Sequence, residues 1–222
     1  MSELHSSLGE LFSNPAVEAE GIEASRGTVI FEQSATAEHV YWIHRGQVRL
    51  YQTAANGEER LVEILGAGQW FGCASLSERG RYTTRAVAAA AGQLSKVSAK
   101  KLLEHIAQHP QAAAELIKQL ASQVAHAREE AARLQFEDCN QRLIQAMLRF
   151  SESAAATSQG ADVVLHLTHA QLAQAVGAAR ETISLALTEM RVRNVVRTGR
   201  NRLIFNRDAL RQFASSDKMQ SA

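Results

Sequence analysis

The spacing of hydrophobic positions changes twice along the chain and divides it into three segments. Between residues 20 and about 98, apolar residues form short runs rich in β-branched and aromatic side chains, with glycines at or near their ends. From about Pro110 the apolar residues recur every third or fourth position. Beyond Asp138, helical patterns alternate with turns and finish in a short hairpin pattern. The chain is therefore predicted to be an α+β protein, with a β-rich segment followed by helices.

The first segment, residues 1–110, is predicted to be a small barrel or sandwich. Asn56-Gly57 predicts a hairpin with a type I′ turn, because both residues tolerate left-handed backbone conformations. This segment shows no nucleophile–base arrangement, so we expect a sensor or scaffold without catalytic residues or a metal site. The predicted strands are residues 29–31, 40–43, 48–51, 61–65, 82–90 and 94–97.

The second segment, residues 111–137, carries a heptad pattern of apolar residues. A seam of this kind favours pairing with a second helix, here a second copy of the chain. The alternative is a helix that lies on its own β domain. We call the following positions the seam: Ile117, Leu120, Val124, Ala127, Ala131 and Leu134.

The third segment, residues 138–222, contains a predicted helix-turn-helix, which places a short helix in the DNA major groove. Thr168 and Gln171 form a capping box, and Gly177 ends the first helix. The second helix begins with polar residues, where base edges would be met. Inward-facing apolar positions are predicted at Leu172, Ala173 and Val176 in the first helix, and at Ile183, Ala186, Leu187 and Met190 in the second.

The rest of this segment is predicted from shorter signals. Asp138 and Gln141 form a second capping box ahead of an apolar helix over residues 143–150. Residues 151–160 are predicted to be a loop, and residues 208–214 a last short helix. Between them, residues 195–205 form a small hairpin, or wing.

Charge distribution supports a nucleic-acid partner for the third segment. The net charge of the 222-residue chain is only +1, but residues 166–211 hold eight arginines and three acids, whereas the remainder carries more acids than bases. Concentrated positive charge of this kind is typical of phosphate contact. No apolar run reaches the roughly 20 residues that span a bilayer, and the N-terminus lacks a signal-peptide profile. A cytoplasmic protein without a membrane partner is expected.

In this order, a β-roll, a long dimerisation helix and a winged helix-turn-helix resemble the Crp/Fnr superfamily of bacterial transcription regulators. The resemblance covers about residues 20–211, and its strongest motif is Arg180-Glu181-Thr182-Ile183-Ser184. The motifs Gly68-Gln69-Trp70-Phe71-Gly72 and Tyr82-Thr83-Thr84-Arg85-Ala86-Val87-Ala88 lie where the family's β-roll motifs lie. The resemblance implies a homodimer, formed through residues 111–137, that binds a palindromic DNA site and works with RNA polymerase.

For DNA, the resemblance implies that Arg180 and Glu181 read base edges, with Ser184 matching the serine of the oxygen-sensing branch. Most members carry a second arginine at the next position. Here that residue is Leu185, which can contact a thymine methyl group but cannot donate to guanine, so the half-site is expected to differ. The expected phosphate contacts are Thr168, Thr182, Arg200 and Arg202.

For the effector, this chain departs from the cyclic-nucleotide binders that it resembles. Cys73 replaces their ribose-binding glutamate, and Tyr82 replaces their phosphate-binding arginine, with Arg81 one residue early. Ala127 and Arg128 replace polar residues of the dimer helix. We therefore expect no tight binding of cyclic AMP and no resident cofactor, and leave the effector unidentified. The residues predicted to line an effector pocket are Gly72, Cys73, Tyr82, Thr83 and Arg128.

Three alternatives remain open from the sequence. Two distant cysteines cannot supply four iron–sulfur ligands, but haem needs as little as one His or Cys ligand, and Cys73, His39 and His44 are candidates. Cys73 could also serve as a thiol redox switch, or simply as a small buried residue. The rival from another class is an enzyme or small-molecule carrier that uses a β-roll domain.

Overall fold

The computed structural model describes residues 12, 17–78, 80–136 and 138–220. At positions 115, 119, 126, 129–130, 132–136 and 216–220 it describes the backbone alone. Contacts divide the chain into two units, one of Met1–Thr53 with Leu65–Ala131 and one of Ala54–Ile64 with Ala132–Ala222. None of the helices in the described ranges is long and apolar enough to cross a bilayer.

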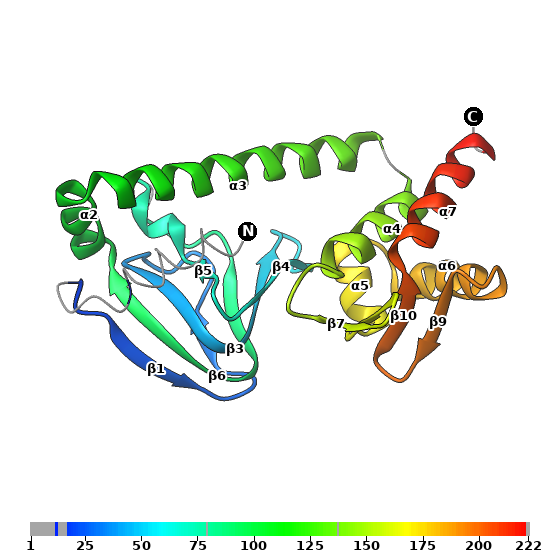
Figure 1. Cartoon of the computed structure of the whole chain (residues 1–222), viewed down its shortest axis with the longest axis horizontal. Coiled ribbons are helices and arrows are strands. Elements are labelled where there is room, and N and C mark those ends of the chain that lie inside the picture. The colour runs from blue at the N-terminus through cyan, green and yellow to red at the C-terminus, as the bar shows by residue number, and fades with distance from the viewer. Residues whose placement is uncertain (1–11, 13–16, 79, 137, 221–222) are drawn as a thin grey trace. The chain divides into compact units, whose positions relative to one another are not determined.

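Residues 20–98 form an antiparallel β-roll (Figure 1). Its sheet has the order β1-β6-β3-β4, while β2 pairs with β6 and β5 pairs with β3. This confirms the predicted N-terminal β fold. The strands are β1 (Glu20–Ala24), β2 (Val29–Phe31), β3 (His39–Thr53), β4 (Glu59–Gly66), β5 (Trp70–Phe71) and β6 (Arg85–Ser98).

Two long strands replace four shorter predicted ones. The sequence predicts breaks at Gly46 and near Gly92, but β3 and β6 each continue through them and pair along their length. At this point the backbones approach so closely that a Cβ on Gly46 would lie 2.7 Å from the Gly92 Cα, and one on Gly92 would lie 2.3 Å from the Arg45 carbonyl oxygen. The glycines therefore permit bulged pairing rather than end the strands. The strand predicted over residues 82–90 begins only at Arg85.

The type I′ prediction for Asn56-Gly57 is wrong. Gly57 has a positive φ of 83°, but Asn56 is not among the residues with positive φ. The connection between β3 and β4 is five residues long, and the Gly57 N–H donates to the Ala54 carbonyl at 2.9 Å. Longer hairpin loops are commonly built around an ordinary type I turn, which needs only the residue after it to be left-handed.

Helices α2 (Ala99–Gln108) and α3 (Pro110–Phe136) follow the roll, and α2 was not predicted. They cover a second apolar cluster, in which Leu102 and Leu116 pack with Trp42, Trp70 and other buried residues of the roll. Leu120, a seam residue, packs partly against this cluster, whereas Ile117 is 65% exposed and Val124 is 51% exposed. One face of α3 therefore covers its own β domain, and part of the seam stays uncovered within a single chain. Leu134 lies outside the residues whose side chains are described.

The second unit holds the predicted helix-turn-helix and wing (Figure 1). Its four-stranded sheet has the order β7-β8-β10-β9. Part of the predicted loop 151–160 is in fact the strand β7, β8 was not predicted, and the last helix is longer than expected. The elements are α4 (Cys139–Phe150), β7 (Ala156–Gln159), β8 (Asp162–Leu165), α5 (His169–Val176), α6 (Arg180–Val192), β9 (Val196–Gly199), β10 (Arg202–Asn206) and α7 (Arg207–Gln220).

Helix α4 begins where Asp138 caps it. The Asp138 carboxylate accepts a hydrogen bond from the Gln141 backbone N–H at 2.8 Å. Its apolar face is buried, with Leu143, Ile144 and Met147 fully shielded from solvent. Helix α4 packs against α5 and α7, and so forms the centre on which the helix-turn-helix rests.

Candidate DNA-reading surface and effector region

Helix α5 begins with the predicted capping box. The Thr168 hydroxyl accepts from the Gln171 backbone N–H at 3.1 Å, and the Gln171 side chain accepts from the Thr168 N–H at 3.0 Å. Two N–H groups that the helix itself cannot pair are thereby satisfied. The helix buries Leu172, Ala173 and Val176, as predicted. These local bonds fix the start of the helix-turn-helix from a four-residue sequence.

The turn between α5 and α6 depends on Gly177. Its φ of 69° and ψ of 52° are left-handed, and its N–H donates to the Ala173 carbonyl at 2.9 Å. The Ala178 N–H donates to the same carbonyl at 3.1 Å, so the last turn is closed without a side chain. Ala179 then precedes α6 and provides no side-chain cap. The first N–H groups of α6 are therefore left for a partner outside the helix.

Helix α6 separates an apolar face from a polar one. All four positions predicted to face inward are buried, namely Ile183, Ala186, Leu187 and Met190. On the other side, Arg180, Glu181 and Thr182 are exposed in the first turn, and Leu185 is 74% exposed one turn later. The core thus fixes the rotation of α6, so that Arg180 and Glu181 face solvent.

Ser184 is only partly exposed, because His169 of α5 is hydrogen-bonded to it. Ser184 Oγ lies 3.0 Å from His169 Nδ1. Partial burial, and then the positive charge of Arg180, lower the pKa of His169 below its ordinary value. Sequence reasoning missed this histidine. Its position directly after the helix cap marks it as the first residue of α5, but nothing in the sequence indicates its partner in the second turn of α6.

The residues predicted to contact phosphate are divided between the helices and the wing. Thr168 is partly buried and uses its hydroxyl in the cap, whereas Thr182 is exposed on α6. Arg200 and Arg202 are exposed where β9 turns into β10, and Asn201 between them has a φ of 56°. Gly199 pairs with Arg202 across the hairpin, so the wing ends in the two-residue turn Arg200-Asn201.

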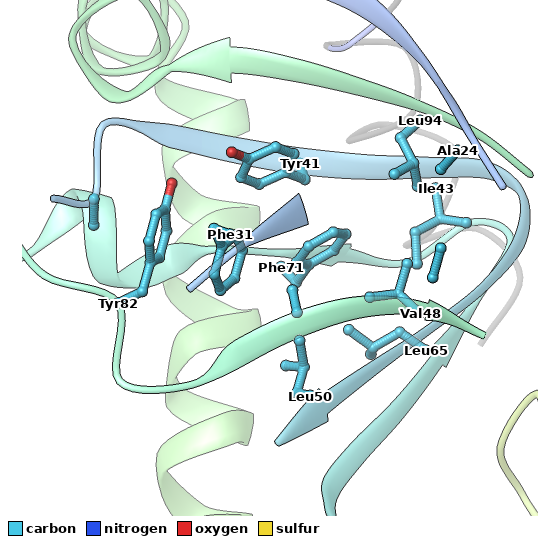
Figure 2. Close-up of a cluster of buried hydrophobic side chains, with 13 residues drawn as sticks. Ala24, Phe31, Tyr41, Ile43, Val48, Leu50, Leu65, Phe71, Tyr82 and Leu94 are labelled. Carbon is cyan, nitrogen blue, oxygen red and sulfur yellow. The ribbon is translucent and has the colours of Figure 1, made fainter. Parts of the chain in front are cut away.

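The interior of the β-roll is occupied by its own aromatic side chains (Figure 2). Tyr82 stacks on Phe31 and lies near Tyr41, while Tyr41 stacks on Phe71 with ring centroids 5.0 Å apart. The Tyr82 hydroxyl donates to the His39 carbonyl at 2.9 Å and accepts from the His39 N–H at 3.2 Å. Burial, and then contact with Tyr82, raise the pKa of Tyr41. The Tyr41 phenol is therefore a neutral packing group at physiological pH.

The other residues predicted to line an effector pocket are not all gathered in this interior. Gly72 precedes the short helix η2 (Cys73–Leu76), and a Cβ there would lie 2.9 Å from the His39 carbonyl oxygen and 3.0 Å from the Tyr41 ring. Cys73 is half-buried, with its Sγ 3.9 Å from Gln123 Oε1 of α3. The remaining two, Thr83 and Arg128, are exposed.

Arg81, His39 and His44 are each hydrogen-bonded to other residues of the roll. Arg81 is exposed and donates to the Ser34 carbonyl at 2.7 Å. His44 is exposed, with its Nε2 2.7 Å from Ser95 Oγ, and the backbone of His39 bonds to Tyr82. Among the described residues, no group of three or more His, Cys, Asp or Glu side chains is arranged to hold a metal ion.

Comparison with known families matches both units. A model of the cyclic nucleotide-binding domain matches residues 22–109, and a model of the Crp-like helix-turn-helix domain matches residues 141–213. Of the solved structures, the c-di-GMP responsive global regulator of Xanthomonas campestris gives a TM-score of 0.77 at 18% identity, covering 89% of this chain and 99% of that one. At that identity the likeness shows the fold.

Two proteins of Thermus thermophilus are closer in sequence than this structural neighbour. A solved transcriptional regulator of the CRP/FNR family is 26% identical with a TM-score of 0.71, and the match covers 88% of this chain and 98% of that one. The cyclic AMP receptor protein is 32% identical over 174 residues, which is 78% of each chain. Together with the two domain matches and the geometry of α5 and α6, this places the chain in the Crp/Fnr family of transcription regulators, with a helix-turn-helix DNA-binding domain.

Proposed function

We propose that this regulator reads DNA bases with Arg180, Glu181 and Ser184 on the exposed face of α6. The observation that carries the proposal is the fixed rotation of that helix, whose apolar face is buried and whose first turn presents Arg180 and Glu181 to solvent. Arginine can bridge the two major-groove acceptors of guanine, and a carboxylate accepts from the amino group of cytosine. Phosphate contacts come from Thr168, Thr182, Arg200 and Arg202, which orient the protein on the duplex but carry no base preference.

Leu185 gives the site a preference of its own. With 74% of its surface exposed, it lies on the same face as Arg180 and Glu181. An aliphatic side chain contacts the thymine methyl group, which only thymine presents in the major groove. The half-site bound by this chain therefore contains a thymine where relatives with an arginine at this position read guanine.

The regulator acts as a homodimer on a palindromic site. Support comes from α3, where Ile117 and Val124 are large apolar residues left uncovered in the single chain. Ala127 and Ala131 are small and exposed, and allow a second helix to approach closely. Two recognition helices must then lie about one DNA turn apart, roughly 34 Å, so a change in dimer geometry changes affinity.

Cyclic AMP is not the signal. The Thermus relative is named as a cyclic AMP receptor, but the position where cyclic-nucleotide binders carry a phosphate-binding arginine is Tyr82 here. The ring of Tyr82 is packed on Phe31, and its hydroxyl is bonded to the His39 backbone. Cys73 and Ala127 likewise lack the oxygen atoms that would hold a ribose or a base. Activity is set either by another ligand or by the amount of protein.

The remaining partners follow from the family. A regulator that activates transcription from a bound site works with RNA polymerase, and the protein acts in the cytoplasm where DNA is accessible. Enzymatic activity is no part of this proposal, because the named relatives are transcription regulators. A haem or redox role for Cys73 is the second candidate. It is favoured only by the half-buried thiol at the start of η2.

The test begins by selecting the preferred site from a random pool of DNA duplexes. Gel shifts with single-base variants of that site then compare wild type with Arg180→Ala and Glu181→Ala. Each substitution should relax preference at one base pair, at a cost of roughly 1–3 kcal/mol. The matched control is Arg200→Ala, which should weaken binding to all DNA sequences alike and lower the salt dependence of binding. Uniform weakening by all three variants would refute the assignment of base contacts.

A further inference from the structure

We propose that His169 determines which bases Ser184 recognises, by accepting a hydrogen bond from the Ser184 hydroxyl and leaving the Ser184 oxygen as a hydrogen-bond acceptor toward DNA. The inference rests on the proposed role of Ser184 in base reading. His169 itself is a positioning residue, because it acts through Ser184 and not through its own contact with a base.

The contact joins the two helices of the reading unit. His169 is the first residue of α5 and Ser184 lies in the second turn of α6, and their Nδ1 and Oγ atoms are 3.0 Å apart. The position of His169 is fixed by Thr168, whose capping box with Gln171 sets the start of α5. Ser184 is fixed by the buried side of α6, where Ile183 is fully shielded from solvent. Neither partner needs to move to keep the bond.

The direction of the bond depends on which ring nitrogen of His169 carries the proton. Partial burial and the charge of Arg180 disfavour the positively charged imidazolium form of His169, and so lower its pKa. A neutral imidazole carries its proton on one nitrogen and accepts at the other. In the proposed state the ring carries its proton on Nε2, which keeps Nδ1 as the acceptor, so that the Ser184 hydroxyl donates to it.

A serine hydroxyl has a single proton to donate. Once that proton is directed at His169, the lone pairs of Ser184 Oγ are what remains for the DNA. In the major groove, exocyclic amino groups are the donors, on N6 of adenine and N4 of cytosine. Guanine and thymine offer acceptors at their corresponding positions. The pair His169–Ser184 therefore selects adenine or cytosine at one base of the half-site.

Two substitutions at His169 separate this role from a packing role. His169→Phe keeps an aromatic ring but removes Nδ1, so the Ser184 hydroxyl can instead donate its hydrogen bond to DNA. Binding to guanine or thymine at that one position should rise by roughly 5–10-fold relative to the preferred base, the size expected for one hydrogen bond. His169→Asn places an amide oxygen near the position of Nδ1, and should retain the wild-type preference.

The experiment measures affinity for single-base variants of the selected DNA site. The proteins compared are the wild type, both His169 variants, Ser184→Ala and the double variant His169→Phe/Ser184→Ala. Ser184→Ala should abolish the preference at one position, and the double variant should match it. If Ser184→Ala abolishes the preference while His169→Phe leaves it intact, the inference is overturned. If Ser184→Ala changes nothing, the inference also fails, but Arg180→Ala still tests the proposed DNA reading independently.

A second measurement needs no DNA and is made on the wild-type protein, so it does not depend on whether a variant folds. Nitrogen NMR of the wild-type protein at neutral pH distinguishes a protonated from an unprotonated Nδ1. We expect an unprotonated Nδ1 at His169, and a signal that shifts in Ser184→Ala. A protonated Nδ1 would show that the ring donates to Ser184, and would overturn the proposal.

Discussion

The rings of Phe31 and Tyr82 stack inside the β-roll with their centroids 3.7 Å apart and their planes only 10° from parallel. Tyr82 is 5% exposed, and its hydroxyl both donates to and accepts from the backbone of His39. Tyr82, which the resemblance places where related proteins carry a ligand-binding arginine, is thus a structural member of this core. This contact determines what substitutions in the roll should do.

Tyr82→Ala should lower the free energy of unfolding of the roll by about 3–5 kcal/mol, as is usual for removing a buried aromatic side chain. Tyr82→Phe keeps the stack and loses the hydrogen bonds of the hydroxyl, including those to His39, at a cost of about 1 kcal/mol. Urea unfolding followed by tryptophan fluorescence measures both, because the two tryptophans of the chain, Trp42 and Trp70, are buried in the same unit. Equal losses in the two variants would contradict a role for the stack.

Calorimetry should show no binding of cyclic AMP at micromolar concentrations. The resemblance places Tyr82 where a cyclic phosphate would be held, and Tyr82 brings an aromatic ring there instead of a cation, while Cys73 brings a thiol. The cyclic AMP receptor protein of Thermus thermophilus serves as the positive control. A dissociation constant in the micromolar range or below would refute the proposal that another signal is used.

The double variant Val124→Glu/Ala131→Glu should be monomeric in analytical ultracentrifugation and should lose specific DNA binding. A carboxylate in the seam would be buried without a partner in the dimer, which is strongly unfavourable. Ser122→Glu is the matched control, because Ser122 is exposed on α3 outside the seam. This variant should stay dimeric. Dimers that persist in the double variant would show that pairing uses another surface.

Thr168→Ala should destabilise the second unit by about 1 kcal/mol, the usual cost of losing a helix N-cap. It should also weaken DNA binding without changing base preference, since Thr168 is a proposed phosphate contact. Thr168→Ser keeps the hydroxyl that accepts from Gln171 and should restore both properties. Urea unfolding followed by far-ultraviolet circular dichroism, with gel shifts, provides the two measurements.

The stability of the second unit should fall on acidification below about pH 6.5, the ordinary pKa of histidine. The pKa of His169 is lowered in the folded chain by burial and by Arg180, so the unfolded chain binds a proton more readily. The contribution of His169 is complete above pH 6.5 and is lost as the pH falls towards its folded-state pKa. His169→Asn should remove this part of the pH dependence. The pKa of His105 is also lowered, but His105 is present in both the wild type and the variant, so its contribution is the same in the two proteins.

The helix-turn-helix could be predicted almost residue by residue because its signals are local. The capping box of Thr168 and Gln171 and the left-handed Gly177 act within a few positions of the backbone that they fix. The fusion of predicted strands into β3 and β6 could not be predicted, because it depends on a contact between residues 46 residues apart, Gly46 and Gly92. Helix α2 was missed because its ten residues follow directly on the predicted β segment.

The candidate site shows the same difference between local and distant signals. The exposed positions of Arg180 and Glu181 follow from the helical period of the apolar residues behind them. The bond between His169 and Ser184 does not, because it joins two helices whose crossing depends on the packed core of the unit. No periodicity marks a polar pair of that kind.

The close approach of Gly46 and Gly92 has a consequence for how this domain can change over time. At either position a Cβ would meet the backbone of the opposite strand, so changing one residue cannot be offset by making the other smaller. Substitution of either glycine is therefore disfavoured whatever residue stands at the other. In the aromatic interior, by contrast, one side chain can be replaced by another of similar volume. In a library of random variants selected only for folding, these two positions should remain glycine while the walls of the roll diversify.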